Sequence, residues 1–273
     1  MIISQPAINT AIQKGEKFLC KNLLPWGEIP IFKIVKGIEH SYTFMPIATA
    51  YYLNSCQNLL AENTQYGNFF QKNWMPKNSA NIIRNSHPEI DTHIKLLYIY
   101  YYQIISKSEH SQHRLEIDLS ELETEVKFID DIAVEMNLIE LQSIVDAEKF
   151  NRNIKKLNYD KFLRSRSLFY NSKYFHYYQF AKMFTKKRNL DTDEWYIKTS
   201  AQDFESILDM VFFTYFLLIV NSASKDICKN IEMILSNQSK DGDWPADSFF
   251  INCFGSKALT TAFCVELLKE YMK

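Results

Sequence analysis

The residues best suited by type to move a proton lie in one short stretch, His87-Pro88-Glu89-Ile90-Asp91-Thr92-His93. It holds two carboxyls, two residues apart, between two imidazoles. An apolar cavity disfavours the charged form of a carboxyl, so a buried aspartic acid can keep a proton and donate it. Proline followed by acidic residues is equally typical of the first turn of a helix. Both interpretations of Glu89 and Asp91, proton donor and helix cap, stay open at this point.

A second carboxylate group could bind a metal. Asp130, Asp131 and Glu135 in FIDDIAVE lie close enough in sequence to offer three oxygen ligands to Mg²⁺. The surrounding sequence is rich in Glu and Asp, and we expect these residues to form a solvated helix face. Arg164 and Arg166, which lie among aromatic positions, are weaker candidates for binding an anion.

Composition excludes several classes of protein. A net charge of −1 argues against a nucleic-acid binder, which would normally carry a basic patch. Five widely spaced cysteines without a CxxC pair, and no stretch typical of a signal peptide, predict a cytoplasmic protein. The most apolar run, Met210 to Val220, is much shorter than the ~20 residues that span a bilayer. We expect it to be a buried inner helix, with a helix that dips into one face of a membrane as the alternative.

The spacing of apolar residues predicts an all-α protein. Only 6 glycines and 7 prolines leave few turn residues for a many-stranded β fold. No Gly/Ser-rich linker divides the chain, which favours one domain over residues 1–273. The predicted helices cover residues 5–22, 42–60, 91–106, 119–145, 147–157, 160–186, 202–221, 224–237 and 256–272.

One turn motif stands out near the end of the chain. Gln238, Gly242 and Trp244 follow a predicted helix, so the helix should close with a tight glycine turn. The glutamine amide can then bond exposed backbone groups, and the indole can pack over the turn. Weaker copies of this spacing are Phe18-Asn22-Gly27-Ile29 and Leu60-Asn63-Gly67-Phe69. Repeated helix–turn units predict a closed or curved array of helical hairpins.

The Gln238-x3-Gly242-x-Trp244 pattern resembles the QW repeat of the squalene and oxidosqualene cyclases. Residues 255–268 resemble the helix after the last such repeat in small bacterial members of that superfamily. GEIPIFK and FMPIATAYYL resemble the N-terminal part of these proteins, so the likeness covers about a third of the chain. Asn230 and Ile234 depart from the motif, which prefers glycine and an aromatic there. The resemblance implies an α/α-toroid, a barrel of antiparallel helical hairpins of the terpenoid cyclase/prenyltransferase β type.

The same resemblance implies an activity. Class II terpene cyclases carry a DxDD acid motif at the start of a helix, and in PEIDTH its acidic places fall on Glu89, Asp91 and Thr92. Asp91 would then donate the initiating proton to an isoprenoid and Glu89 would support it, in an isomerase or lyase reaction. The third carboxylate of the motif is missing, so enzymatic activity is left open, with a class II-type cyclase favoured.

Carbocation chemistry also needs aromatic faces, which stabilise positive charge without attacking it. The chain has 16 tyrosines and 20 phenylalanines, although aromatics at helical spacing are equally expected in an ordinary core. The residues expected to contact substrate are Tyr51, Tyr98, Tyr101, Phe169, Tyr174 and Phe212.

Partners and cofactors follow from these interpretations. We expect an isoprenoid small molecule as substrate, no nucleic acid and no cofactor, with Mg²⁺ needed only if the substrate is a diphosphate. Prenyltransferase β subunits hold zinc, and Asp226-Ile227-Cys228 matches part of their ligand set, but all six histidines precede it whereas that family's ligand histidine follows. Full class II cyclases usually build their site between two barrels, and this chain has room for one, so a homodimer stays open. Peripheral membrane contact stays open as well. The alternative function is a non-catalytic toroid that binds a lipid or a protein partner.

Overall fold

The structure, a computed structural model, describes residues 3–22, 123–124, 126, 131–156, 162, 164–186, 204–220, 223–249 and 255–273. They fall into two compact units. The first unit draws on Met1–Ala61 and Phe169–Lys273, and the second on Glu62–Leu168. The described residues contain helices and no strand, and Asp247 and Ser256 form an isolated antiparallel β-bridge. The prediction of a single domain over 1–273 stays a prediction.

Two helices of the first unit are buried on every side over most of their length. These are α12 (Ile207–Val220) and α14 (Lys257–Tyr271). In α12 every residue from Leu208 to Leu217 is buried, which agrees with the inner helix predicted for this run. An element that is apolar all round must be surrounded by other elements, so α12 and α14 form the centre of this unit.

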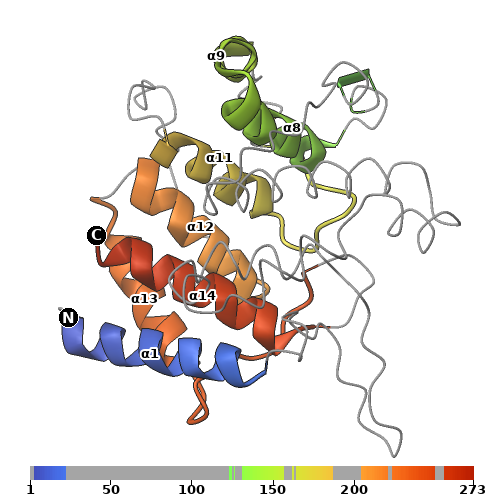
Figure 1. Cartoon of the computed structure of the whole chain (residues 1–273). Coiled ribbons are helices and arrows are strands. Elements are labelled where there is room, and N and C mark those ends of the chain that lie inside the picture. The colour runs from blue at the N-terminus through green and yellow to red at the C-terminus, as the bar shows by residue number, and fades with distance from the viewer. Residues whose placement is uncertain are drawn as a thin grey trace, which may run out of the picture. The chain divides into compact units, whose positions relative to one another are not determined.

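Two amphipathic helices pack on this centre. In α1 (Gln5–Lys21) the buried residues recur every three or four positions, and α1 packs against α14. Figure 1 shows α1 (blue) antiparallel to α14 (red). In α13 (Lys225–Ser236) one stripe is buried against α12, where the Asn230 amide donates to the Thr214 hydroxyl over 3.0 Å. The buried residues of α1 are Ile8, Ala11, Ile12, Gly15 and Leu19.

The helix α11 (Phe175–Lys186) also packs against α12. The sequence predicted one helix over 160–186, but residues 165–174 are not helical. Side-chain and tertiary hydrogen bonds compete with the helix here: the Ser172 hydroxyl accepts from the Tyr174 amide, and the Asn171 amide donates to the Phe249 carbonyl. The prediction was therefore wrong for residues 165–174.

The second unit contains α8 (Ile132–Val145) and α9 (Ala147–Lys156), which pack against each other. The sequence predicted an unbroken helix over 119–145, but Asp131 has extended dihedral angles and begins α8 as its N-cap. Asp146 separates α8 from α9 in the same way, because its carboxylate accepts from the amides of Glu148 and Lys149.

The other predicted ranges within the described residues are confirmed to within a few residues. Range 5–22 corresponds to α1, 147–157 to α9, 202–221 to α12, 224–237 to α13 and 256–272 to α14. Ser224 and Ser256 cap α13 and α14 with their hydroxyls. None of the described helices combines the length and the apolar composition that a membrane span requires. Ranges 42–60 and 91–106 lie outside the described residues.

Candidate functional site

Five of the eight residues predicted to act on substrate lie outside the described part of the chain. They are Tyr51, Glu89, Asp91, Tyr98 and Tyr101. The structure describes the other three, Phe169, Tyr174 and Phe212, and all three belong to the first unit. Phe169 is half-buried, whereas Tyr174 and Phe212 are buried.

Tyr174 and Phe212 belong to an aromatic ladder between α11 and α12. Ring centroids lie 4.9 Å apart for Tyr174 and Phe213, and 5.1 Å apart for Tyr177 and Phe216. The contacts advance along both helices in the same direction, so α11 and α12 run parallel. Neighbouring parallel helices that are not joined by a short turn are what the inner layer of a helical toroid requires. Further pairs of the ladder are Phe175–Phe212, Tyr178–Phe212 and Tyr178–Tyr215.

Phe212 is the point at which three helices meet. Its ring contacts Phe175 on α11 at 5.2 Å and Phe263 on α14 at 4.8 Å between centroids. Tyr178 contacts Phe263 as well, at 5.5 Å. These geometries, tilted or edge-to-face, are those that aromatic side chains adopt in a packed core. Among the described residues, Phe212 therefore packs as a core residue with neighbours on several sides.

A buried ion pair lies next to this aromatic cluster. Lys182 Nζ on α11 is 3.0 Å from Glu266 Oε1 on α14, and their side chains are 8% and 12% exposed. The hydroxyl of Tyr178 donates to Glu266 Oε2 over 2.5 Å and accepts from Lys182 Nζ over 3.1 Å. The Lys182 ammonium also lies 5.1 Å from the centre of the Tyr178 ring. This triad joins α11 to α14 and was not identified from the sequence.

A second polar group lies at the first turn of α12. Asp209 is buried, and its carboxylate accepts from the Ser172 hydroxyl over 2.5 Å. Burial raises the pKa of Asp209, and the nearby Asp247 carboxylate adds to this, whereas hydrogen bonds from Ser172 and the Glu205 amide and the charge of Lys173 oppose it. The sequence signal for Asp209, like that for Lys182 and Glu266, is a charged residue within an otherwise apolar stretch of helix.

The turn after α13 has the geometry predicted from Gln238, Gly242 and Trp244. Gly242 has a φ of 93°, a left-handed conformation that glycine adopts without strain. Gln238 Nε2 donates to the Gly242 carbonyl over 3.0 Å, and Trp244 Nε1 donates to the Ile234 carbonyl over 2.6 Å. The indole is fully buried and closes the end of the helix. This turn therefore has a structural role.

The same turn holds α1 in place. A Cβ on Gly242 would lie 2.4 Å from the Lys14 carbonyl oxygen, and one on Gly15 would lie 2.6 Å from Val265 Cγ2. Both glycines thus permit a close approach that a side chain would prevent. Glu16 on α1 and Lys269 on α14 add an ion pair of 2.6 Å.

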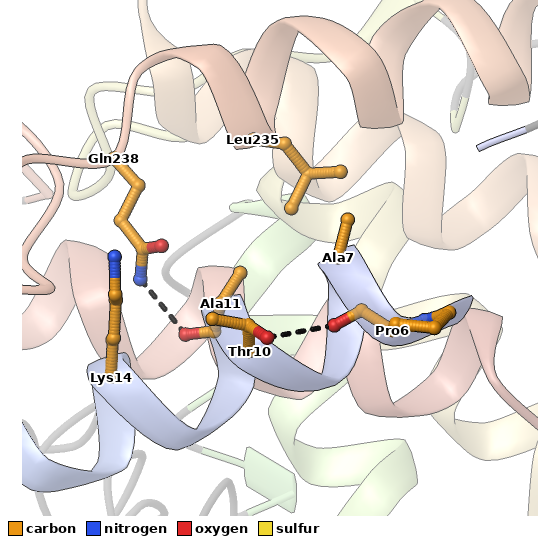
Figure 2. A pocket seen from close by; sticks show the side chains of 7 residues that line it. All are labelled: Pro6, Ala7, Thr10, Ala11, Lys14, Leu235 and Gln238. Carbon is orange, nitrogen blue, oxygen red and sulfur yellow. Dashed lines mark hydrogen bonds between the residues drawn. The ribbon is translucent and has the colours of Figure 1, made fainter. Parts of the chain in front are cut away.

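A shallow groove of about 410 Å³ lies where α1 meets the end of α13. Figure 2 shows Lys14 and Gln238 at one end of it and Pro6 at the other, with the hydrogen bond from Gln238 to the Ala11 carbonyl near the first end. The Thr10 hydroxyl is occupied by a bond to the Pro6 carbonyl over 2.8 Å. The groove is mostly apolar and holds no arrangement of acid and base that could catalyse a reaction.

Asp131, one of the possible metal ligands, is a helix cap. Its carboxylate accepts from the amides of Ala133 and Val134, from the Leu168 amide over 2.5 Å and from the Ser167 hydroxyl. Asp131 is 3% exposed, so the solvated helix face expected here was wrong for this residue. Asp130 lies outside the described residues.

Three further candidates for binding metals or anions, Cys228, Arg164 and Arg166, are exposed. The Cys228 sulfur is 3.7 Å from the Tyr271 hydroxyl. In the part of the chain that the structure describes, no three His, Cys, Asp or Glu side chains converge as a metal site would require.

Comparison with known proteins places the fold. No protein-family model matches the chain, and no curated protein matches it in sequence. Among solved structures, the type II terpene cyclase MstE from Scytonema is similar, at 10% identity and a TM-score of 0.58, over 97% of this chain and 98% of that one. A variant of MstE in complex with its substrate, geranylgeranyl dihydroxybenzoate, gives 11% identity and a TM-score of 0.59, over 97% of each chain. A protein from Actinoplanes gives 10% identity and a TM-score of 0.57, over 97% of this chain and all of that one. The chain thus has the all-α, α/α-toroid fold that the sequence predicted.

Proposed function

We propose that this protein is a terpene cyclase-like enzyme that cyclises an isoprenoid substrate by protonation. The observation that carries this proposal is the likeness to type II terpene cyclase structures over nearly the whole of both chains. Because fold alone does not determine function, the acidic pair in PEIDTH supplies the chemical part of the argument. The fold and the acid motif are independent features of the chain, and both point to the same class of enzyme.

In the proposed reaction, the carboxylic acid of Asp91 protonates a terminal alkene of the substrate. The resulting carbocation is attacked by the next double bond, which forms a ring and moves the positive charge along the chain. Loss of a proton from a neighbouring carbon ends the reaction, so the product is an isomer of the substrate. Glu89 supports Asp91 by hydrogen bonding, which makes the acid stronger in a cavity that keeps it neutral.

The length of the chain supports a site within one chain. MstE chains of nearly the same length are matched over 97% to 99% of their residues, and two of them are bound to substrate. A second helical barrel is therefore not needed for this proposal.

The choice of substrate follows from the similar structures. MstE is described with geranylgeranyl dihydroxybenzoate, an isoprenoid chain on an aromatic acid. We infer a substrate of that general kind for this protein, a long isoprenoid chain with an aromatic or other polar head group. If the head group is a diphosphate, Mg²⁺ would be required to bind it.

The test is to incubate the purified protein with squalene, C15 and C20 isoprenoid alcohols and diphosphates, and prenylated aromatic acids, with and without Mg²⁺. Products are separated by chromatography and identified by mass spectrometry and NMR. Asp91→Asn and Glu89→Gln test the acid, and Asp241→Asn, which changes an exposed carboxyl in the turn after α13, is the matched control.

A cyclic isomer that forms with wild type and Asp241→Asn, but not with Asp91→Asn, would support protonation by Asp91. A product that survives Asp91→Asn and requires Mg²⁺ would contradict the proposed mechanism and direct attention to Asp130. No product from any substrate, together with tight binding of one of them, would favour the alternative of a toroid that binds lipid without turnover.

A further inference from the structure

One hydrogen-bonded network joins the N-terminal ends of α11, α12 and α14. At its centre, the Asp209 carboxyl bonds the hydroxyl of Ser172, which precedes α11, over 2.5 Å. The Glu205 amide, before α12, donates to the other oxygen of Asp209 over 3.3 Å. The carboxylate of Asp247, before α14, accepts from the Leu208 amide over 2.9 Å. Asp209 and Asp247 therefore hold the start of α12 from two sides.

Asp247 extends the network to α14. Its amide donates to the Thr260 hydroxyl over 3.2 Å, and its carbonyl accepts from the Ser256 amide over 3.2 Å. The Ser256 hydroxyl in turn caps α14 by accepting from the Leu259 amide over 3.2 Å. The loops before three buried helices are thus fixed by two carboxyls and three hydroxyls.

Asp209 has fewer stabilising partners than Asp131, and it lacks the close lysine that Glu266 and Asp243 each have. Asp131 accepts from three amides and a hydroxyl. Glu266 meets Lys182, and Asp243 meets Lys257. Asp209 accepts from one hydroxyl and one amide and lies near the carboxylate of Asp247. A buried carboxylate with so few hydrogen-bond donors has lost much of its hydration, and hydrogen bonds from the protein replace only part of it.

The charged groups near Asp209 do not neutralise it. Lys173 acts on it from a distance and is also 3.9 Å from the carboxylate of Glu205, whose side chain is 80% exposed. Cys264 on α14 is influenced by the charge of Asp247. Burial raises the pKa of the Cys264 thiol well above its usual value, so the thiol stays neutral. Asp247 is the remaining charged group facing Asp209 in the described structure, and it repels a second negative charge.

We propose that Asp209 is a proton-controlled latch, which ties the N-terminal ends of α11, α12 and α14 together while it is protonated and loosens them when it ionises. In the neutral form, the short bond to Ser172 persists and no charge is buried. In the ionised form, a buried charge with few donors lies within the electrostatic influence of Asp247, and this cost falls when the loops open and water enters. This proposal does not depend on the proposed function.

The direction of the pH dependence follows from the raised pKa of Asp209. Folding favours the protonated form, so the stabilisation is complete at pH values below the pKa of an unfolded aspartic acid. It is lost as the pH rises through the higher pKa of the folded protein. The latch should therefore be closed at acid pH and should open as the pH rises through the raised pKa of Asp209.

The test is amide hydrogen exchange followed by mass spectrometry from about pH 4 to about pH 8, corrected for the intrinsic pH dependence of exchange. In wild type, protection of peptides covering 204–210 and 245–249 should fall by about tenfold across this range, while peptides from α1 keep their protection. In Asp209→Asn, which cannot ionise, protection should not change with pH. Asp241→Asn, a change at an exposed carboxyl, should behave as wild type.

Two further variants test the cause. Ser172→Ala removes a hydrogen bond that lowers the pKa of Asp209, so the loss of protection should move to higher pH. Asp247→Asn removes the neighbouring charge that raises this pKa, so the loss should move to lower pH. Shifts in these opposite directions support the latch even if Asp209→Asn fails to fold. The proposal is overturned if wild-type protection is independent of pH, or if neither variant shifts its midpoint.

Discussion

The side-chain amide of Gln238 donates a hydrogen bond to the main-chain oxygen of Ala11 over 2.8 Å, although 227 positions separate the two residues in sequence. The same amide nitrogen also donates to the Gly242 carbonyl. One glutamine thus fixes its own turn and fastens α1 to it. A side chain that both closes a helix end and binds a distant helix explains why the turn after α13 requires a glutamine, a glycine and a tryptophan at this spacing.

We predict that Gln238→Ala lowers the free energy of unfolding by about 1–2 kcal/mol, because two partly buried carbonyls lose their donor. Gln238→Glu should lower the free energy of unfolding by at least as much, because a carboxylate oxygen would face both carbonyls and cannot donate a hydrogen bond. Urea unfolding monitored by circular dichroism measures the change. Gln13→Ala, an exposed position on α1, should change stability by less than about 0.5 kcal/mol. Equal effects at both positions would show that the glutamine does not fasten α1.

A second prediction compares two helix caps of the second unit. Asp131→Ala should cost about 2–4 kcal/mol, because its buried carboxylate serves the first turn of α8 and also Ser167 and Leu168. Asp146→Ala removes an ordinary, partly exposed cap of α9 and should cost about 1 kcal/mol. Chemical unfolding of the two variants under identical conditions gives the difference. The capping role assigned to Asp131 is wrong if its substitution costs no more than that of Asp146.

The sequence predicted the helices of the first unit well where burial is periodic or complete. The stripe of Ile8, Ala11, Ile12 and Leu19 predicts α1, and the apolar run in α12 predicts a buried helix; both are confirmed. The prediction failed in 160–186, where the local pattern is helical but Ser167 and Ser172 bond distant carboxylates instead of continuing the helix. Such bonds depend on tertiary structure, and helical periodicity carries no information about them.

The polar groups inside the first unit were harder to predict for a related reason. Asp209, Lys182 and Glu266 each stand alone in an apolar stretch, and Asp209 bonds Ser172 in the loop before α11, whereas Lys182 and Glu266 pair between two helices. Spacing within one helix cannot identify a partner on another. By contrast, Gln238, Gly242 and Trp244 lie within seven residues of one another, so their turn could be predicted from local geometry alone.

Acid stability should depend on Asp243 and Lys257. Burial alone would raise the pKa of Asp243, but hydrogen bonds from Lys257 and Ser239 outweigh it and the pKa is lowered. The ionised form is thus favoured by folding, and its stabilisation, present at neutral pH, is lost as the pH falls through the lowered pKa. Lys257→Met should raise this pKa, so that the melting temperature begins to fall at a higher pH on acidification.

Thermal unfolding at a series of acidic pH values tests this expectation. Lys273→Met is the matched control, because its ammonium pairs with Glu270 at an exposed position. That variant should follow the wild-type pH profile. Identical profiles for Lys257→Met and wild type would mean that the pair between Lys257 and Asp243 contributes nothing to stability in acid.

The buried pair of Lys182 and Glu266 allows a comparison with a half-buried pair that has the same distance between nitrogen and oxygen. Lys149 and Glu123 are also 3.0 Å apart, but their side chains are 32% and 25% exposed, against 8% and 12% for Lys182 and Glu266. Removing one partner of a buried pair leaves the other charge without compensation, so Lys182→Met should cost about 3–5 kcal/mol. Lys149→Met should cost at most about 1 kcal/mol, because water solvates the remaining Glu123.

The double variant separates two contributions to the free energy of unfolding: the cost of one buried charge left without its partner, and the stabilisation by the ion pair itself. Lys182→Met/Glu266→Met replaces the ion pair by apolar side chains and should be more stable than Lys182→Met alone, because no charge is left buried. The Tyr178 hydroxyl loses both of these partners in that variant, so adding Tyr178→Phe should recover further stability. Unfolding free energies of the set, combined in a double-mutant cycle, give the coupling between the two charges. A double variant no more stable than Lys182→Met would contradict this account and would indicate that the two side chains act independently.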